Sequence, residues 1–338
     1  MKIRTNSVII PLLLILAAGL FSACAAPLPE GTGQIYLYGE LHSMEAHCEK
    51  ELELWSDYYH KNGMRHLFIE YPYYYTEYLN LWMKDDDDEI LDALYQDIEG
   101  TVAHCPLTLD FLRRIKQECP ETVFHGTDVG HQYHTTGKRF LAYLESAGQA
   151  DTEQYRLALE CVEQGWYFYE NADHVYRENM LAENFIREMD GLGNADIMGI
   201  YGGGHVEADG MDYVNGSVSC MSNQLHEKYG EDLHTQFIST VVEPLRTDTI
   251  TVKGKDYTAQ YFGKRYMSQN TSYDYVEFWR LEDAWEDFQA YPSTIYSHYY
   301  YTTFFPMTVE QGQVLVLEYT KPDGVVTREY HRADSIRQ

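Results

Sequence analysis

Short apolar runs alternate with longer amphipathic stretches over residues 34–243 of this chain. Each run is bounded by Gly or Pro, as is typical of a strand buried in a parallel sheet. The runs are IYLY (35–38), HLFIE (66–70), TVFHGTD (122–128) and ADIMGIYGGGH (195–205). We expect these four runs to be strands of one sheet.

The stretches between these runs have the spacing of amphipathic helices. Leu52, Trp55 and Tyr59 fall on one helical face, and Leu112 and Ile115 fall on another. The stretches cover residues 44–62, 107–118, 137–147 and a pair at about 152–189. Strands that alternate with helices form βαβ units, so the pattern predicts an α/β fold with a mostly parallel central sheet and flanking helices.

The pattern changes at about residue 244, where β-rich runs such as TIYSHYYYTTFF (294–305) follow one another. KPDG at 321–324 is a turn signal between two such runs. We expect antiparallel strands here, which either extend the first sheet or form a small appended β domain. The predicted division is a signal peptide at 1–23, a linker at 24–33, an α/β domain at 34–243 and a β-rich extension at 244–338.

The first 23 residues are typical of a secretory signal. Lys2 and Arg4 precede the stretch VIIPLLLILAAGLF, which is shorter than the roughly 20 apolar residues of a membrane span. FSAC at 21–24 resembles a bacterial lipoprotein box, in which the cysteine becomes the lipidated (palmitate-bearing) first residue. We therefore expect a lipid anchor at Cys24, on the extracytoplasmic face of a bacterial cell membrane. Ordinary cleavage near ACAAP, which leaves a soluble secreted protein, is the alternative.

The chain is strongly acidic, with 53 Asp and Glu residues against 25 Lys and Arg and a formal net charge of -28. Such a surface does not neutralise phosphates, so the composition argues against a nucleic-acid partner. It is compatible with cationic ligands or divalent metals. The acidic run KDDDDE at 84–89 lacks the alternating ligands and the Gly of a calcium loop, and we interpret it as a solvated loop or helix start.

Cysteine spacing gives little sign of a metal knuckle or a disulfide framework. Five cysteines remain besides Cys24, an odd number without any Cys-x-x-Cys pair. One bridge, for example Cys105 with Cys119, is compatible with an oxidising compartment.

Ionisable side chains follow all four predicted strands of the parallel sheet. The first strand leads into Glu40 and His42, the second ends in Glu70, the third in Asp128, and the fourth leads through three glycines to His205. In open α/β sheets, ligands bind outside the carboxyl ends of the strands. We therefore expect these five side chains to meet in one crevice.

Two histidines and three carboxylates in one crevice support two chemistries. They can bind a divalent metal with an open position for water. Alternatively, a His and a Glu act as general base and general acid on a bound substrate without a metal. The candidate metal ligands are His42, Glu70, His205 and Asp128.

Arg177 is a further candidate, on the predicted helix NADHVYRENMLAENFIREM. It lies one helical turn from Leu181, beside an apolar stripe, and in that position it clamps an anion or a developing oxyanion in the crevice. The alternative is a surface arginine paired with Glu178 or Glu170.

This ordered set resembles the TIKI/TraB, ChaN-like and erythromycin-esterase superfamily over about residues 34–240. The shared features are Gly-x-x-His at 39–42, Glu70, Arg177 followed by Asn-Met, and a second Gly-x-x-His at 202–205. YGELHS is most similar to the ChaN-like branch, lipoproteins associated with haem or iron uptake, and the paired motif is similar to the TIKI metalloprotease pattern. The erythromycin-esterase branch has its first His one residue further from the Glu. The resemblance carries over His42, Glu70 and His205, followed by Glu40 and Arg177.

Two other features of the sequence are compatible with ligand binding. His125, His131 and His134 lie close together in sequence beside Asp128 and form either a second metal site or a solvated loop cluster. The 31 tyrosines are enough to line an aromatic pocket for haem or a carbohydrate, but a mixture of sheet faces and amphipathic surface accounts for them equally well.

The sequence thus predicts an extracytoplasmic, lipid-anchored hydrolase that acts on an ester or amide bond of a small molecule or peptide. Water is activated by His42 with Glu40 or Glu70, His205 is a second base or a metal ligand, and Arg177 stabilises negative charge. The alternative is a haem- or iron-binding lipoprotein without turnover. A third reading is an inactive surface-interaction domain on the same fold.

Overall fold

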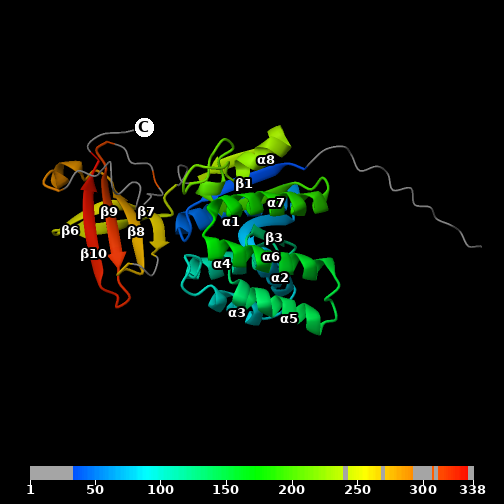
Figure 1. Cartoon of the computed structure of the whole chain (residues 1–338). Coiled ribbons are helices and arrows are strands. Elements are labelled where there is room, and N and C mark those ends of the chain that lie inside the picture. Colours follow the sequence, from blue (N-terminus) through cyan, green and yellow to red (C-terminus); the bar gives the residue numbers. More distant parts are fainter. Residues whose placement is uncertain (1–32, 239–242, 268–270, 292–306, 308–310, 334–338) are drawn as a thin grey trace, which may run out of the picture. The chain divides into compact units, whose positions relative to one another are not determined.

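The structure is a computed structural model that describes residues 33–238, 243–267, 271–291, 307 and 311–333. The predicted signal peptide, Cys24 and the run at 294–305 lie outside the described residues. Within them, two five-stranded sheets are present, one parallel and one antiparallel (Figure 1). The predicted fold class is confirmed: an α/β part with a parallel sheet, followed by an antiparallel β part.

The parallel sheet has the strand order β3-β2-β4-β1-β5. Its carboxyl ends are in register, since Glu40 pairs with Gly202 across β1 and β4, and Pro72 pairs with Asp128 across β2 and β3. The four predicted strand ends therefore lie at one edge of the sheet. The strands are β1 (Ile35–Glu40), β2 (His66–Pro72), β3 (Val123–Asp128), β4 (Ile197–Gly202) and β5 (Leu233–Phe237).

The fifth strand, β5, is absent from the sequence prediction. Its sequence LHTQF has one buried apolar residue, Leu233, because it pairs only with β1 at the edge of the sheet. An edge strand that is largely exposed does not show the continuous apolar run of a buried parallel strand.

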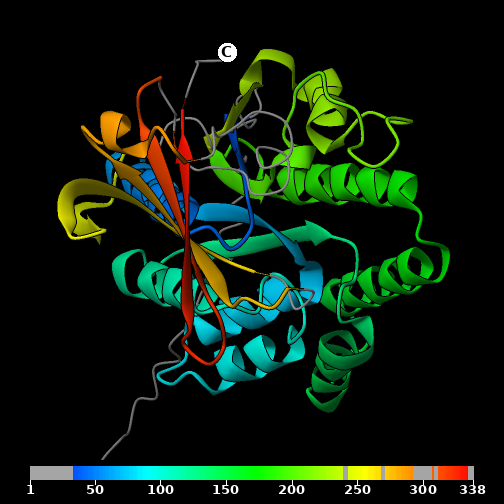
Figure 2. The same ribbon diagram turned by 90° about the vertical axis from the view of Figure 1, so that its left-hand side faces the viewer.

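Eight α-helices cover the two faces of the parallel sheet in the described residues. They are α1 (Glu45–Asn62), α2 (Tyr73–Trp82), α3 (Glu89–Asp97), α4 (Pro106–Glu118), α5 (Lys138–Ser146), α6 (Glu153–Asn171), α7 (His174–Leu192) and α8 (Met221–Tyr229). One core joins the sheet to α1–α6, and a second core joins the opposite face to α7 and α8. Figure 2 shows this division, with α7 and α8 on one side of the strands and α2 and α3 on the other.

Alternation along β1 sends successive side chains to the two cores. Ile35 and Leu37 belong to the core under α7 and α8, while Tyr38 belongs to the core under α1–α6. This is the period of two that a strand buried on both faces requires. Fully buried Trp55 and Trp82 are among the largest side chains of the α1–α6 core.

The helix α7 begins at a cap that fixes where its first turn lies. Asp173 accepts a hydrogen bond from the Tyr176 backbone N–H at 3.0 Å, which satisfies one of the free amides of the first turn. Arg177 and Glu178 follow directly, beside the carboxyl ends of the strands. A side-chain cap thus positions two charged residues of the site.

The antiparallel sheet has the order β10-β9-β8-β7-β6 and is separate from the parallel sheet. This decides between the two predicted alternatives for the β-rich part, in favour of a second sheet. An isolated β-bridge joins Met44 to Arg265, and the Tyr266 N–H donates to the Ser43 carbonyl at 3.0 Å. The strands are β6 (Arg246–Val252), β7 (Lys255–Tyr266), β8 (Tyr275–Leu281), β9 (Val314–Thr320) and β10 (Val326–Arg332).

The five described cysteines are free thiols. Cys105 and Cys119 cap opposite ends of α4, which places them roughly 20 Å apart at 1.5 Å per residue. A disulfide needs Cα atoms within about 7 Å, so the bridge considered above does not form in this fold. No helix among the described residues is both long and apolar enough to cross a membrane.

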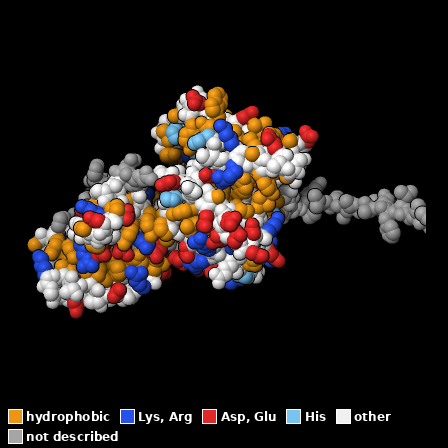
Figure 3. Space-filling view, turned by 90° about the horizontal axis from the view of Figure 1, so that it is seen from below, with side chains coloured by type: hydrophobic (Ala, Val, Ile, Leu, Met, Phe, Trp, Pro, Cys, Tyr) orange, Lys and Arg blue, Asp and Glu red, His pale blue; other side chains and the backbone are white. Residues whose placement is uncertain are grey.

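Charged side chains of both signs are interspersed on the face shown in Figure 3. Ion pairs such as Arg114–Glu49 at 2.6 Å and Arg113–Asp88 at 2.8 Å join neighbouring helices of the α/β part. Asp85–Asp87 are exposed, and the half-buried Asp88 directly precedes α3, so the acidic run is a solvated loop before a helix start, as the sequence indicates.

Candidate active site

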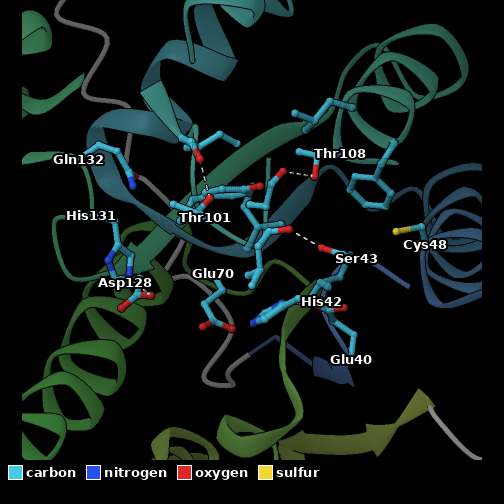
Figure 4. Close-up of a pocket in the computed structure, with 18 of the residues that line it drawn as sticks. Glu40, His42, Ser43, Cys48, Glu70, Thr101, Thr108, Asp128, His131 and Gln132 are labelled. Carbon is cyan, nitrogen blue, oxygen red and sulfur yellow. Dashed lines mark hydrogen bonds and ion pairs between the residues drawn. The ribbon is translucent and has the colours of Figure 1, made fainter. Parts of the chain in front are cut away.

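A pocket of about 380 Å³ opens at the carboxyl ends of the parallel strands (Figure 4). Its volume is within the usual range for small-molecule sites, roughly 300–1,000 Å³. It lies at the edge that the strand-end rule indicates. The ionisable residues that line it are Glu40, His42, Cys48, Glu51, Glu70, Tyr71, Asp128, His131, Tyr169 and Arg177.

Arg177 joins two of the predicted carboxylates. Its Nη2 donates to Glu70 Oε1 at 2.6 Å and to Asp128 Oδ2 at 2.6 Å, and its Nε donates to Asp128 Oδ1 at 3.0 Å. All three side chains are nearly buried, so these charge-assisted bonds are shielded from water. Arg177 therefore faces the crevice, and the alternative of a surface pair with Glu178 or Glu170 is wrong.

The two carboxylates are held in the ionised form. Burial raises the pKa of Asp128, but the charges of Arg177 and His131 outweigh burial and hold it well below its usual range. Burial likewise raises the pKa of Glu70, and His205, His42 and Arg177 together lower it well below its usual range. Neither group is a general base at neutral pH, since neither takes up a proton there.

His205 lies between two carboxylates. Its Nε2 is 3.5 Å from Glu70 Oε1, and its Nδ1 is 2.7 Å from Glu178 Oε1. Burial lowers the pKa of His205, but Glu70 and Glu178 raise it to about 10. His205 is therefore an imidazolium at neutral pH, a fixed positive charge rather than a second base.

Glu178 is a site residue that the sequence analysis missed as a partner of His205. Its other oxygen, Oε2, accepts from the Met221 N–H at the start of α8 with a length of 2.8 Å. The signal for it was present, because Glu178, Leu181 and Phe185 have the i, i+3, i+7 spacing of one buried stripe. An acidic residue within an apolar stripe is buried only when it has a partner.

His42 is more exposed than Glu40, Glu70, Asp128 and Arg177, with 44% of its side chain exposed. Its Nδ1 is hydrogen-bonded to Glu40. The charge of Glu40 raises the pKa of His42, burial lowers it, and the result is about 9. Figure 4 shows His42 and Glu70 pointing toward one another.

One hydrogen bond and one unusual backbone conformation define the turn that carries His42. The Leu41 N–H donates to His47 Nδ1 at 2.9 Å, and Ser43 has a left-handed φ of 63°. A left-handed conformation is uncommon for a residue with a side chain and indicates that the surrounding structure imposes it. The strand end is thus bent sharply to turn His42 toward the pocket.

Gly202 leaves the space in which His42 and Glu70 approach each other. A Cβ at this position would lie 3.1 Å from His42 Nε2 and 3.2 Å from Glu70 Oε2. The Gly202 N–H donates to Glu70 Oε2 at 2.5 Å. Glycine permits this close approach of the backbone to both functional groups.

The histidines of the segment 125–134 do not gather into one site. His131 lines the pocket, with Nε2 2.9 Å from Asp128 Oδ2 and Nδ1 2.7 Å from the Tyr169 hydroxyl. His125 instead contacts His66 at 3.0 Å and Glu188 at 3.1 Å, away from the pocket lining. Among the residues that the structure describes, no group of three or more His, Cys, Asp or Glu side chains has the arrangement of a metal site.

The predicted metal ligands are close together, but they are engaged with other partners. Arg177 donates to Glu70 and to both oxygens of Asp128, so a cation already occupies the space between the two carboxylates. His205 is held as an imidazolium, whereas a metal ligand must be neutral. The set does not fit a metal in this arrangement, and metal binding stays a prediction from the sequence.

Neither a family model nor a curated protein matches this chain. Solved structures that are similar to it include the following three. A Bacillus cereus protein is 13% identical over 73% of this chain and 76% of its own, with a TM-score of 0.46. A mutant of the erythromycin esterase EreC in its open conformation is 12% identical over 69% and 76%, with a TM-score of 0.47. A succinoglycan biosynthesis protein is 13% identical over 67% and 70%, with a TM-score of 0.44. Likeness at this level does not decide what this chain does, so its function is argued from the geometry of its own site.

Proposed function

We propose that this chain is a hydrolase that cleaves an ester or amide bond with water activated by His42. The observation that carries the proposal is the pair of His42 and Glu40, which places a half-exposed imidazole at the pocket, facing the ionised Glu70. A histidine oriented by a carboxylate is the usual arrangement of a general base. The resemblance of the 39–42 and 202–205 motifs to known hydrolases supports the same class.

The reaction requires the neutral form of His42, which is the minor form below its pKa of about 9. Neutral His42 keeps a proton on Nδ1, donated to Glu40, and takes a proton from water through Nε2 as the water oxygen bonds to the carbonyl carbon. The C–O or C–N bond then breaks, and the leaving oxygen or nitrogen takes the proton from Nε2. Glu70 accepts a hydrogen bond from the attacking water and holds it in position.

Arg177 supplies positive charge at the pocket, and His205, which is buried beside Glu70 and is not among the lining residues, adds positive charge behind it. Arg177 lines the pocket, and its Nη1 makes none of the three hydrogen bonds to Glu70 and Asp128 described above. Because Glu70, Asp128 and Glu178 hold both cations in fixed positions, little reorganisation is needed when negative charge develops.

The test is hydrolysis of a panel of 4-nitrophenyl esters and anilides by wild-type and variant chains. We expect His42→Ala to lose roughly 10²–10⁴-fold in rate, the typical contribution of a general base. His60→Ala is the matched control, since His60 is an exposed histidine in the last turn of α1. A His42→Ala chain as active as the wild type would show that the assignment is wrong, and so would a wild type that cleaves none of the panel.

We further propose that the chain is a lipoprotein of the bacterial membrane, anchored through Cys24. The support is the charged start, the apolar stretch and the FSAC sequence. Labelling of growing cells with radioactive palmitate tests this directly. We expect label in the wild type and none in Cys24→Ser, and equal labelling of both would contradict the anchor.

Metal dependence is tested separately, by elemental analysis of the purified chain and of a His42→Ala, His205→Ala double variant. A stoichiometric metal that is lost in the double variant would support the metal-assisted alternative. The haem alternative is tested by titration with haemin. A Soret band that is lost on substitution of His42 would support it, and no binding at micromolar haemin would count against it.

A further inference from the structure

Part of the pocket lining is an apolar wall. Ile98, Phe111 and Leu112 line it, together with the ring of Tyr71. This wall buries apolar surface of a ligand, which favours binding in proportion to the area removed from water.

The hydroxyl groups of this wall are already hydrogen-bonded within the chain. Thr101 donates to the Ile98 carbonyl at 2.8 Å, and Thr108 donates to the Ala103 carbonyl at 2.7 Å. Ser43 donates to a backbone carbonyl in the same way (Figure 4). These side chains therefore have little capacity left as donors to a ligand.

Glu51 is the exception in this wall. It lies on α1, one turn after Cys48, lines the pocket and is only 4% exposed. Its Oε1 is fully buried and has no hydrogen-bond partner among the described residues. Buried polar atoms are normally satisfied, so the carboxyl group of Glu51 has unused hydrogen-bonding capacity at the pocket lining, where its other oxygen is the one that a ligand group can reach.

The chemistry of that ligand group follows from the state of the carboxyl. Burial, and after it the charge of Glu40, raises the pKa of Glu51 well above its usual range, which favours the uncharged carboxylic acid. An uncharged carboxyl both donates and accepts a hydrogen bond. A ligand hydroxyl also does both, whereas an ammonium group only donates.

We propose that Glu51 determines specificity by binding a neutral hydroxyl group carried on an apolar portion of the substrate, while the scissile carbonyl lies at His42. That the hydroxyl belongs to a substrate rests on the proposed hydrolase function, but the binding of such a group by Glu51 does not. Glu51 is not assigned a step in the reaction. It selects apolar compounds with one hydroxyl over those without it.

The test is equilibrium binding of three probes of one shape, 4-methylbenzyl alcohol, p-xylene and 4-methylbenzylamine, to the purified chain, measured by NMR titration. We expect the wild type to bind the alcohol at least about tenfold more tightly than p-xylene. Glu51→Leu abolishes this preference, and Glu51→Gln keeps most of it because a carboxamide also donates and accepts. Glu53→Leu is the matched control, an exposed glutamate on the same helix, and keeps the wild-type preference.

Three results would overturn the proposal. The first is that the affinities for the alcohol and p-xylene differ by less than twofold in the wild type, and the second is that Glu51→Leu retains the preference. A third is that the amine binds most tightly and loses affinity in Glu51→Gln, which would show a charged carboxylate. Because binding requires no turnover, these results are independent of whether the chain hydrolyses esters.

Discussion

His205 Nδ1 lies 2.7 Å from Glu178 Oε1, on the side of the ring opposite to Glu70. One histidine thus joins a carboxylate of α7 to a carboxylate at the end of β2. Both contacts favour the protonated ring, which is why its pKa rises despite burial. The positive charge of the site depends on Glu178 as much as on His205 itself.

Replacement of Glu178 should make stability less dependent on pH. The folded-state pKa of His205, about 10, is above its ordinary value of 6.5, so its contribution to stability is fully present below pH 6.5 and is lost as pH rises to 10. In Glu178→Gln the raised pKa falls, and the decline of Tm between pH 6.5 and 10 becomes shallower. Thermal unfolding at intervals of pH measures this, and an unchanged decline would contradict the pairing.

Replacement of Glu40 should shift the pH profile of hydrolysis. His42 acts as a base only when neutral, so kcat/KM of the wild type should rise with pH toward a plateau above its pKa of about 9. In Glu40→Gln the charge that raises this pKa is removed, and the rise should move to lower pH, with a reduced plateau because the ring is less well oriented. A profile that keeps its midpoint would show that Glu40 does not act on His42.

A methyl group at position 202 should impair activity with little effect on folding. The added Cβ would contact His42 Nε2 and Glu70 Oε2 at about the distances given above, tighter than ordinary van der Waals contact. We expect Gly202→Ala to lower kcat/KM by about 10- to 100-fold, as misplacement by a fraction of an ångström does. Gly191→Ala, where a Cβ meets nothing within 4 Å, is the control and should keep full activity.

Removal of the Arg177 charge should destabilise the fold. Glu70 and Asp128 would remain buried without their shared cation, a loss that typically costs about 3–5 kcal/mol. We expect Arg177→Met to lower the free energy of unfolding by that amount in urea denaturation. A double variant, Arg177→Met with Asp128→Asn, should recover part of the loss, and no recovery would argue against the ion pair.

The position of the site was predictable, and its internal pairing was not. Strand ends in a parallel sheet meet at one edge, so Glu40, His42, Glu70 and Asp128 were expected together from their positions alone. Which carboxylate pairs with Arg177 depends on side-chain directions across 107 residues of sequence. Local spacing does not contain that information.

Buried charged residues within helical stripes were the main omission. Glu178 and Glu51 each occupy a position between apolar residues of α7 and α1, where the periodicity predicts burial for any residue. Glu178 was considered only as a surface partner of Arg177, and Glu51 was given no role. Both positions can be recognised in the sequence as glutamates that fall within the apolar stripe of a predicted helix.

The carboxylates that line the pocket also bear on how a reaction there would finish. An ester or an amide enters without charge, but its hydrolysis leaves a carboxylate between Glu40 and Glu70, both acidic residues of the pocket. The two glutamates repel such a product, whereas Arg177 and, below its pKa of about 9, protonated His42 attract it. Inhibition by accumulated acid should therefore weaken as the pH rises above 9.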